Sequence, residues 1–218
     1  MLKEIYDLKR TLSEKNISGI ALDIDETLSI TVNWFAEKML TKFGNPENLT
    51  VTELITKYKY TYNVPYWQHQ EALDWVAEQI ESNELQEQLP IIENANTYVN
   101  EINLHVPIVA YITNRPETVL SGTKNWLAKH NFSQAPIIAR ENYIPHLVGT
   151  TWKATVLEFL YPQVKAIVDD NASLVKALSK NYPGRVYLYD NKESPRNDID
   201  IVVCKTWQDV VNRIKDSR

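Results

Sequence analysis

The chain has 218 residues, a length that suits one large domain or a core domain carrying an insertion. Its formal net charge of −5 and its lack of a Lys/Arg run argue against binding to a nucleic acid polymer, and no apolar run approaches the roughly 20 residues that a membrane helix needs. The charged N-terminus does not resemble a secretory signal and the one cysteine, Cys204, cannot form an internal disulfide, so we expect a cytoplasmic protein without a membrane partner.

The first elements are a helix and a short buried strand. Apolar residues recur at three- and four-residue spacing over residues 2–15, which predicts an amphipathic helix. Residues 20–24 form a near-continuous apolar run, which is typical of a strand buried on both faces. This strand ends in acidic residues, so we expect its carboxyl end to face a polar site.

The next part of the chain has a different pattern. Apolar residues recur at helical spacing over 33–43 and 67–80, and a tyrosine-rich segment, KYKYTYNVPYW, lies between them. No run typical of a buried strand occurs here. We therefore predict a small helical insertion at residues 33–90, with residues 1–32 and 91–218 forming the core.

From residue 91 onward, expected helices and strands alternate. The expected helices cover 93–103, 116–130 (with Pro116 in the first turn), 152–160, 172–181 and 206–215. The expected strands cover 106–114, 135–140, 165–171, 184–190 and 198–203. This alternation predicts an α/β fold, namely a Rossmann-like three-layer core with a parallel sheet, plus the small α-helical insertion.

Polar side chains follow the predicted strands at their carboxyl ends, where such sheets bind ligands. They are Asp23, Asp25 and Thr27 after the first strand, Thr113, Asn114 and Arg115 after the second, Arg140 after the third, and Asp169, Asp170 and Asn171 after the fourth. Carboxylates that converge repel one another unless a cation neutralises them. Oxygen ligands with room for water suit Mg²⁺, and a hydroxyl, an amide and a cation beside such an ion suit a phosphoryl group.

Two of these carboxylates are separated by one residue at the end of the first strand. A metal-bound aspartate can serve as the nucleophile that accepts a phosphoryl group. A second carboxyl group must then protonate the leaving oxygen and later deprotonate water. We assign the first role to Asp23 and the second to Asp25. Neither phosphate-binding loop of the GxGxxG or GxxxxGK[ST] type is present.

These residues resemble the motifs of a known family. The hexapeptide DIDETL, residues 23–28, resembles the first motif (DxDxT) of the haloacid dehalogenase superfamily. YITN with Thr113 resembles the second motif, Lys153 the third, and IVDD with Asp169 and Asp170 the fourth. The order of the motifs matches. The long stretch between the first two motifs lies where this superfamily inserts a helical cap.

The resemblance implies a role for each matching residue. Asp23 would form an aspartyl-phosphate, and Asp25 would act as the acid/base while its backbone carbonyl binds Mg²⁺. Thr113 would bind the phosphate, and Lys153 would neutralise the nucleophile. Asp23, Asp25, Asp169 and Asp170 would together form the metal site. We expect Thr27, Asn114 and Arg115 to contact the substrate, with Arg115 either a phosphate ligand or a solvated charge.

An aspartate at position 25 favours a phosphatase or a phosphomutase over a dehalogenase. We therefore expect a Mg²⁺-dependent hydrolase of small phosphomonoesters, whose partner is a small phosphorylated metabolite. A non-catalytic binding protein with the same fold is the alternative from another class. ITNRPE together with a helical cap also resembles the 5'-nucleotidase branch, so nucleoside monophosphates are candidate substrates. Aromatic residues of the cap could stack on a base or form the cap's own core; the oligomeric state is left open.

Overall fold

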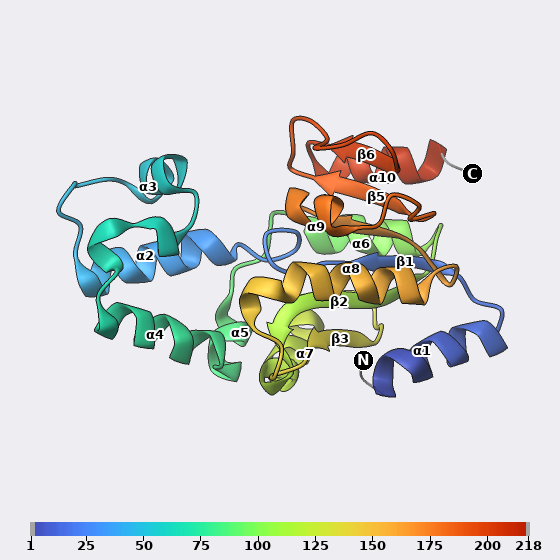
Figure 1. Cartoon of the computed structure of the whole chain (residues 1–218), viewed down its shortest axis with the longest axis horizontal. Helices are drawn as coiled ribbons and strands as arrows, with labels where there is room; N and C mark the ends of the chain where they lie inside the picture. Colours follow the sequence, from blue (N-terminus) through green and yellow to red (C-terminus); the bar gives the residue numbers. More distant parts are fainter. Residues whose placement is uncertain (1–2, 217–218) are drawn as a thin grey trace.

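The computed structural model describes residues 3–216 and consists of a three-layer core beside a group of helices (Figure 1). The sheet contains β1 (Gly19–Leu22), β2 (Ile108–Pro116), β3 (Ile137–Arg140), β4 (Val164–Asp169), β5 (Arg185–Tyr189) and β6 (Asp200–Cys204). All neighbouring strands are parallel, in the order β3-β2-β1-β4-β5-β6. This arrangement confirms the predicted fold class.

Helices cover both faces of the sheet. One face packs against α6 (Ala95–Asn103), α7 (Leu120–Lys129) and α10 (Trp207–Asp216), and the other against α1 (Lys3–Glu14), α8 (Gly149–Leu160) and α9 (Ala172–Ala177). Successive side chains of a strand point to opposite faces, so Ile20 and Leu22 join the first core whereas Ala21 joins the second. Both faces are buried, which explains the continuous apolar run at this strand. Among residues 3–216, no helix is both long and apolar enough to cross a membrane.

The segment between β1 and β2 is helical and lies mostly to one side of the sheet (Figure 1). It contains α2 (Thr31–Phe43), α3 (Val51–Tyr58), α4 (Gln70–Ile80) and α5 (Asn83–Gln88), with 3₁₀ turns at Thr61–Asn63 and Pro65–Trp67. Its small core is built around Met39, Leu54 and Trp67. The sequence analysis did not predict α3 and α5, because each is only one to two turns long. That the segment acts as a cap stays a prediction.

Helix α5, at the end of this segment, is fastened to the core. The side chain of Asn83 accepts hydrogen bonds from the Ser121 hydroxyl at 2.8 Å and from the amide of Gly122 at 2.7 Å. A Cβ atom at Gly122 would lie 2.3 Å from the Asn83 carbonyl oxygen, so only glycine allows this approach. The indole of Trp126 also donates to the carbonyl of Leu89 at 2.7 Å. The insertion therefore leaves the core at α2 and returns to it at α5.

The two linkers that join the insertion to the core lie side by side. The amide of Ile30 donates to the Pro90 carbonyl at 2.8 Å, and the amide of Ile92 donates to the Leu28 carbonyl at 2.8 Å. Ser29 and Ile91 form the antiparallel bridge between them. The linkers are thus held together as a short two-stranded ribbon at the base of the insertion.

Several predicted boundaries are wrong by a few residues. Pro116 does not begin a helix but ends β2 in an extended conformation (φ −69°, ψ 154°), and α7 begins only at Leu120, after a 3₁₀ turn at Glu117–Val119. Helix α9 stops at Ala177 because Leu178 is already extended. The helix containing Lys153 begins earlier than expected, at Gly149, after a 3₁₀ turn at His146–Val148.

Candidate active site

The candidate site lies where the direction of strand order reverses. The chain adds β2 and β3 on one side of β1 and then returns to place β4 on the other side. Asp23 directly follows β1, and Asp169 is the last residue of the adjacent strand β4. Ligands of open α/β sheets bind in the crevice beyond the carboxyl ends of the strands at this reversal. The topology alone therefore brings these two carboxylates together.

Lys153 lies between these carboxylates. Its Nζ atom is 2.7 Å from Oδ1 of Asp23 and 2.9 Å from Oδ2 of Asp169. All three side chains are buried, with at most 8% of any side chain exposed. Burial disfavours the charged lysine, but the two carboxylates outweigh it and raise the pKa of Lys153. The third-motif lysine predicted from the sequence is thus placed against the first-motif aspartate.

Asp23, Asp169 and Asp170 form a cluster of three carboxylates, each offering one oxygen within 4.8 Å of the others. Burial, together with the charge of Asp169, raises the pKa of Asp23 to about 7 despite the opposing effect of Lys153. Burial, together with the charges of Asp169 and Asp23, raises the pKa of Asp170. One lysine is therefore too little positive charge for the cluster.

The residues present fit a divalent cation. Three converging carboxylate oxygens are hard ligands of the kind that Mg²⁺ prefers. The raised pKa values of Asp23 and Asp170 indicate negative charge that a cation would neutralise. The carboxylate of Asp25, in contrast, faces other partners, so its contribution through the backbone carbonyl stays a prediction.

Asp25 is paired with Arg115. The Nη2 atom of Arg115 is 2.7 Å from Oδ1 of Asp25, and its Nε atom is 3.0 Å from Oδ2. Thr31 and Ser29 donate hydroxyl hydrogen bonds to Oδ1, at 2.6 and 3.2 Å. Burial by itself would raise the pKa of Asp25, but Arg115 and the two hydroxyl groups outweigh it and lower that pKa. Arg115 is therefore neither solvated nor facing open space.

Glu26 links this loop to the first helix of the insertion. It has a left-handed backbone (φ 56°), and its Oε1 atom accepts the amide protons of Thr31 and Val32, each at 2.7 Å. These amides belong to the first turn of α2, where backbone donors lack intrahelical partners. The fourth residue of the DIDETL motif thus caps α2 in place of a normal N-cap residue.

Thr27 and Thr113 are both fully buried. The hydroxyl of Thr27 donates to Oδ1 of Asp170 at 3.3 Å and accepts the Asp170 amide at 3.2 Å, which ties the loops after β1 and β4 together. The hydroxyl of Thr113 accepts the amide of Arg115 at 3.2 Å. Their expected contacts with phosphate or substrate stay predictions.

Asn114 is half-buried beside the start of α8. Its Oδ1 atom has no hydrogen-bond partner among the described residues, and a Cβ atom at Gly149 would lie 2.8 Å from it. Its backbone carbonyl accepts from Nε of Arg140 at 3.1 Å. Arg140 also donates to the Ile144 carbonyl, so this buried arginine fixes the loop after β3 to the end of β2.

The aromatic residues of the insertion divide into two groups. Trp67 is fully buried and donates to the Gly44 carbonyl at 3.1 Å, so it belongs to the insertion's own core. Tyr62 is 63% exposed and stacks on Tyr60, with ring centroids 5.1 Å apart. The exposed ring of Tyr62 is therefore accessible to a ligand, whereas that of Trp67 is not.

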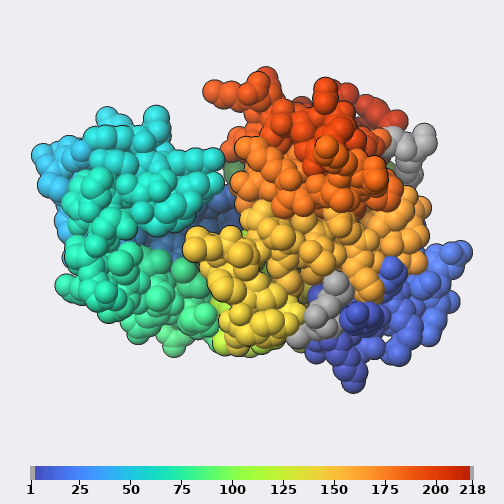
Figure 2. Space-filling view, in the orientation of Figure 1, coloured from blue at the N-terminus to red at the C-terminus, as the bar shows by residue number. Residues whose placement is uncertain are grey.

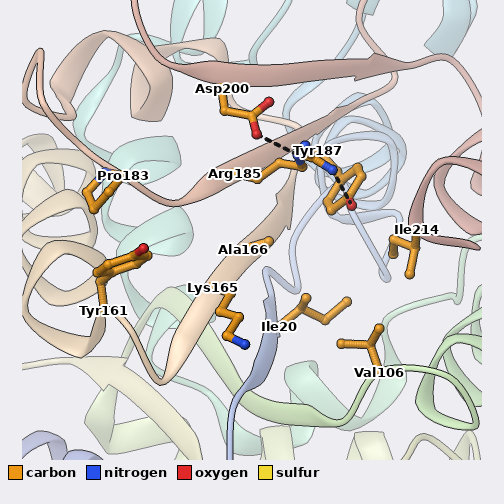
Figure 3. A pocket seen from close by; sticks show the side chains of 10 residues that line it. All are labelled: Ile20, Val106, Tyr161, Lys165, Ala166, Pro183, Arg185, Tyr187, Asp200 and Ile214. Atoms are coloured by element: carbon orange, nitrogen blue, oxygen red, sulfur yellow. Dashed lines mark hydrogen bonds and ion pairs between the residues drawn. The ribbon is translucent and has the colours of Figure 1, made fainter. Parts of the chain in front are cut away.

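A recess separates the insertion from the core in the space-filling view, with residues from the blue N-terminal part of the chain at its floor (Figure 2). A separate hollow of about 360 Å³ lies at the amino ends of the strands, opposite the end that carries the carboxylates (Figure 3). Ile20, Ala166, Arg185 and Asp200, which lie at or near the amino ends of their strands, line this hollow. It is therefore remote from the carboxylate cluster.

Sequence reasoning did not find Ser29, Thr31 or the capping role of Glu26. Their signal lies in the linker after the first motif, where two hydroxyl residues follow Asp25 at four- and six-residue spacing. This spacing brings the hydroxyl groups to Asp25 only because the chain turns back on itself after the first motif. A hydrogen bond from the Leu28 amide to the Ile24 carbonyl closes that turn. A second Asp-Ile-Asp sequence occurs at residues 198–200, but its two aspartates are exposed and paired with Arg196 and Arg185, away from the cluster.

No protein-family model and no curated protein matches the sequence. A crystal structure of a dehalogenase matches with a TM-score of 0.54 at 12% identity, covering 90% of this chain and 96% of that one. A hydrolase of the HAD superfamily, subfamily IA, from Geobacter sulfurreducens matches with 0.51 at 13% identity, covering 91% and 96%. A cytosolic 5'-nucleotidase IIIB bound to cytidine reaches only 0.44 at 12% identity, covering 98% and 91%, which supports no argument about substrate. At these identities the similarity shows the fold alone.

Proposed function

Because the chain has the fold of the haloacid dehalogenase superfamily, we propose that it is a Mg²⁺-dependent phosphatase of small phosphomonoesters that acts through an aspartyl-phosphate. The observation that carries the proposal is the buried triad of Asp23, Lys153 and Asp169 at the reversal of strand order, with Asp170 beside it. A nucleophile, a cation and spare carboxylate ligands meet there.

Each residue then has a chemical task. Asp23 attacks phosphorus through a carboxylate oxygen, and Lys153 favours the ionised form of that buried carboxylate. Asp25 is proposed to take a proton from the water that hydrolyses the aspartyl-phosphate, a base role that its lowered pKa favours. To act as the acid it must first be protonated, and it then passes that proton to the leaving oxygen. Bound by Asp23, Asp169 and Asp170, the metal ion supplies positive charge that offsets the negative charge of the phosphoryl oxygens.

The second strand end supplies groups for the phosphate and the rest of the substrate. Thr113 is proposed to bind the phosphate, and the unpartnered amide oxygen of Asn114 can accept a hydrogen bond from the substrate. Thr27 supports the site through Asp170. The insertion, residues 33–90, is proposed to act as a cap that excludes bulk water. Nucleoside monophosphates stay candidate substrates.

Two other activities share this fold. A dehalogenase is disfavoured because position 25 carries a carboxyl group able to protonate an alkoxide, which a halide does not require. A phosphomutase would return the phosphoryl group to its substrate instead of passing it to water, so transfer between two positions of a sugar phosphate distinguishes it. A non-catalytic binder would release no phosphate at all.

The experiment is phosphate release from p-nitrophenyl phosphate and from a panel of phosphorylated metabolites, with Mg²⁺ and with a chelator. We expect turnover with Mg²⁺, none in chelator, and poor support by Ca²⁺, whose longer bonds would misplace Asp23. Asp23→Asn should abolish turnover. The matched control Asp200→Asn, in the second Asp-Ile-Asp sequence at the surface, should not. Full activity of Asp23→Asn, with unchanged circular dichroism, would refute the covalent mechanism.

A further inference from the structure

We propose that Arg115 is a positioning residue that fixes the direction of the Asp25 side chain and couples it to the base of the insertion. The proposal rests on the function above, because it concerns the group assigned as acid/base. It replaces the expectation that Arg115 is a phosphate ligand or a solvated charge.

The contact between Arg115 and Asp25 is bidentate. Nη2 of Arg115 lies 2.7 Å from Oδ1 of Asp25, and Nε lies 3.0 Å from Oδ2 and 3.2 Å from Oδ1. Two parallel N–H···O bonds between planar groups fix orientation as well as distance. A lysine offers one point charge and cannot reproduce this geometry. The carboxylate plane of Asp25 is therefore set by the guanidinium plane.

Arg115 is itself held in place from several sides. Only 4% of its side chain is exposed. Its Nη1 atom donates to the hydroxyl of Thr123 at 3.3 Å, its Nη2 atom also donates to Ser29 at 3.1 Å, and the guanidinium lies 5.8 Å from the ring centre of Trp126. To reach a substrate phosphate, Arg115 would have to leave all of these partners. Its surroundings suit a fixed support better than a ligand-binding group.

The other partners of Asp25 come from the linker into the insertion. Thr31 is the first residue of α2, and its hydroxyl donates to Oδ1 of Asp25 at 2.6 Å. Ser29, in the two-stranded ribbon, donates to the same oxygen at 3.2 Å and also contacts the Thr31 hydroxyl. A displacement of α2 relative to β2 must lengthen one of these contacts. The direction of the Asp25 side chain thus depends on the position of the insertion.

The chain offers a matched control for the loss of a buried arginine. Arg140 is equally buried and ends the neighbouring strand β3, but its guanidinium donates to the backbone carbonyls of Asn114 and Ile144. If both arginines serve only stability, their alanine variants should melt alike and lose activity alike. A positioning role predicts a kinetic effect specific to Arg115.

The test combines kinetics with crystal structures of the wild type, Arg115→Lys and Arg115→Ala. With an alkyl phosphate as substrate, Arg115→Lys should lower kcat by about 10²–10³-fold, within the range for loss of general acid catalysis, and change KM little. The loss should be smaller with p-nitrophenyl phosphate, whose leaving group needs less protonation. Guanidinium added to Arg115→Ala should restore part of kcat, and Arg140→Ala should show neither the difference between the two substrates nor the rescue.

Three outcomes would overturn the proposal. The first is a raised KM with kcat retained, which would make Arg115 a substrate ligand. The second is an equal loss for both substrates that follows the melting temperature. The third is a crystal structure of Arg115→Ala in which Asp25 keeps its direction. If the wild type hydrolyses no phosphomonoester, the proposed function fails. The direction of Asp25 in the wild-type and Arg115→Ala structures still decides whether Arg115 positions it.

Discussion

Removing the ammonium group of Lys153 tests the electrostatics of the site directly. Lys153→Met keeps the length of the side chain but leaves Asp23 and Asp169 buried without their shared cation. Breaking a buried ion pair by removing one partner costs about 3–5 kcal/mol, because a buried charge is left uncompensated. At about 2–4 °C per kcal/mol for a chain of this size, the melting temperature should fall by roughly 6–20 °C.

The assay is thermal unfolding in chelator and in Mg²⁺, with Lys165→Met as the control. Lys165 is an exposed lysine near the start of β4, so its loss should change stability by no more than about 0.5 kcal/mol. Mg²⁺ should stabilise Lys153→Met more than the wild type, because the variant presents more uncompensated negative charge to the ion. Equal melting temperatures for the two variants in chelator would show that Lys153 does not neutralise a buried cluster.

Four further predictions concern acidity, the insertion and its attachment. The raised pKa of Asp23, about 7 against an ordinary 3.8, means that the folded metal-free protein binds this proton more tightly than the unfolded chain does. Its stability should therefore fall as pH rises from about 4 to 7, and Asp23→Asn should flatten that slope in denaturant titrations. Trp67→Ala should lower the free energy of unfolding by about 3–5 kcal/mol and lower kcat/KM for all substrates to the same extent. Tyr62→Ala should instead spare the melting temperature and lower kcat/KM for a nucleotide by roughly 5- to 150-fold relative to p-nitrophenyl phosphate, as loss of base stacking predicts. Asn83→Ala removes hydrogen bonds to Thr118, Ser121 and Gly122, so unfolding experiments should show a loss of roughly 2–4 kcal/mol.

The sequence predicted the sheet because the signal for buried strands is local. Six apolar runs bounded by polar residues correspond to six strands, and the acidic ends of two of them meet because strand ends in a parallel sheet share an edge. The proximity of Asp23, Lys153 and Asp169 follows from strand order and from the burial of one face of α8. These features depend on periodicity and topology, which a sequence displays directly.

The partners of Asp25 could not be predicted in the same way. Arg115 turns inward because Thr123 and Trp126, on the next helix, offer it a hydroxyl and a ring face. That arrangement depends on where α7 begins, and its start at Leu120 lies four residues after the predicted start at Pro116. Side-chain direction after a strand depends on tertiary packing, which no short sequence pattern specifies.

The ribbon formed by residues 28–30 and 90–92 also has a consequence for how such chains can diversify. Its hydrogen bonds hold the two ends of the insertion next to each other, whatever the length of the segment between them. The entropy of closing a loop grows only logarithmically with its length, so doubling the insertion would cost about 0.6 kcal/mol. Length and content can therefore change within the insertion while the spacing of the carboxylates stays constant. Under the proposed function, the insertion and the carboxylate cluster can therefore change independently within one chain.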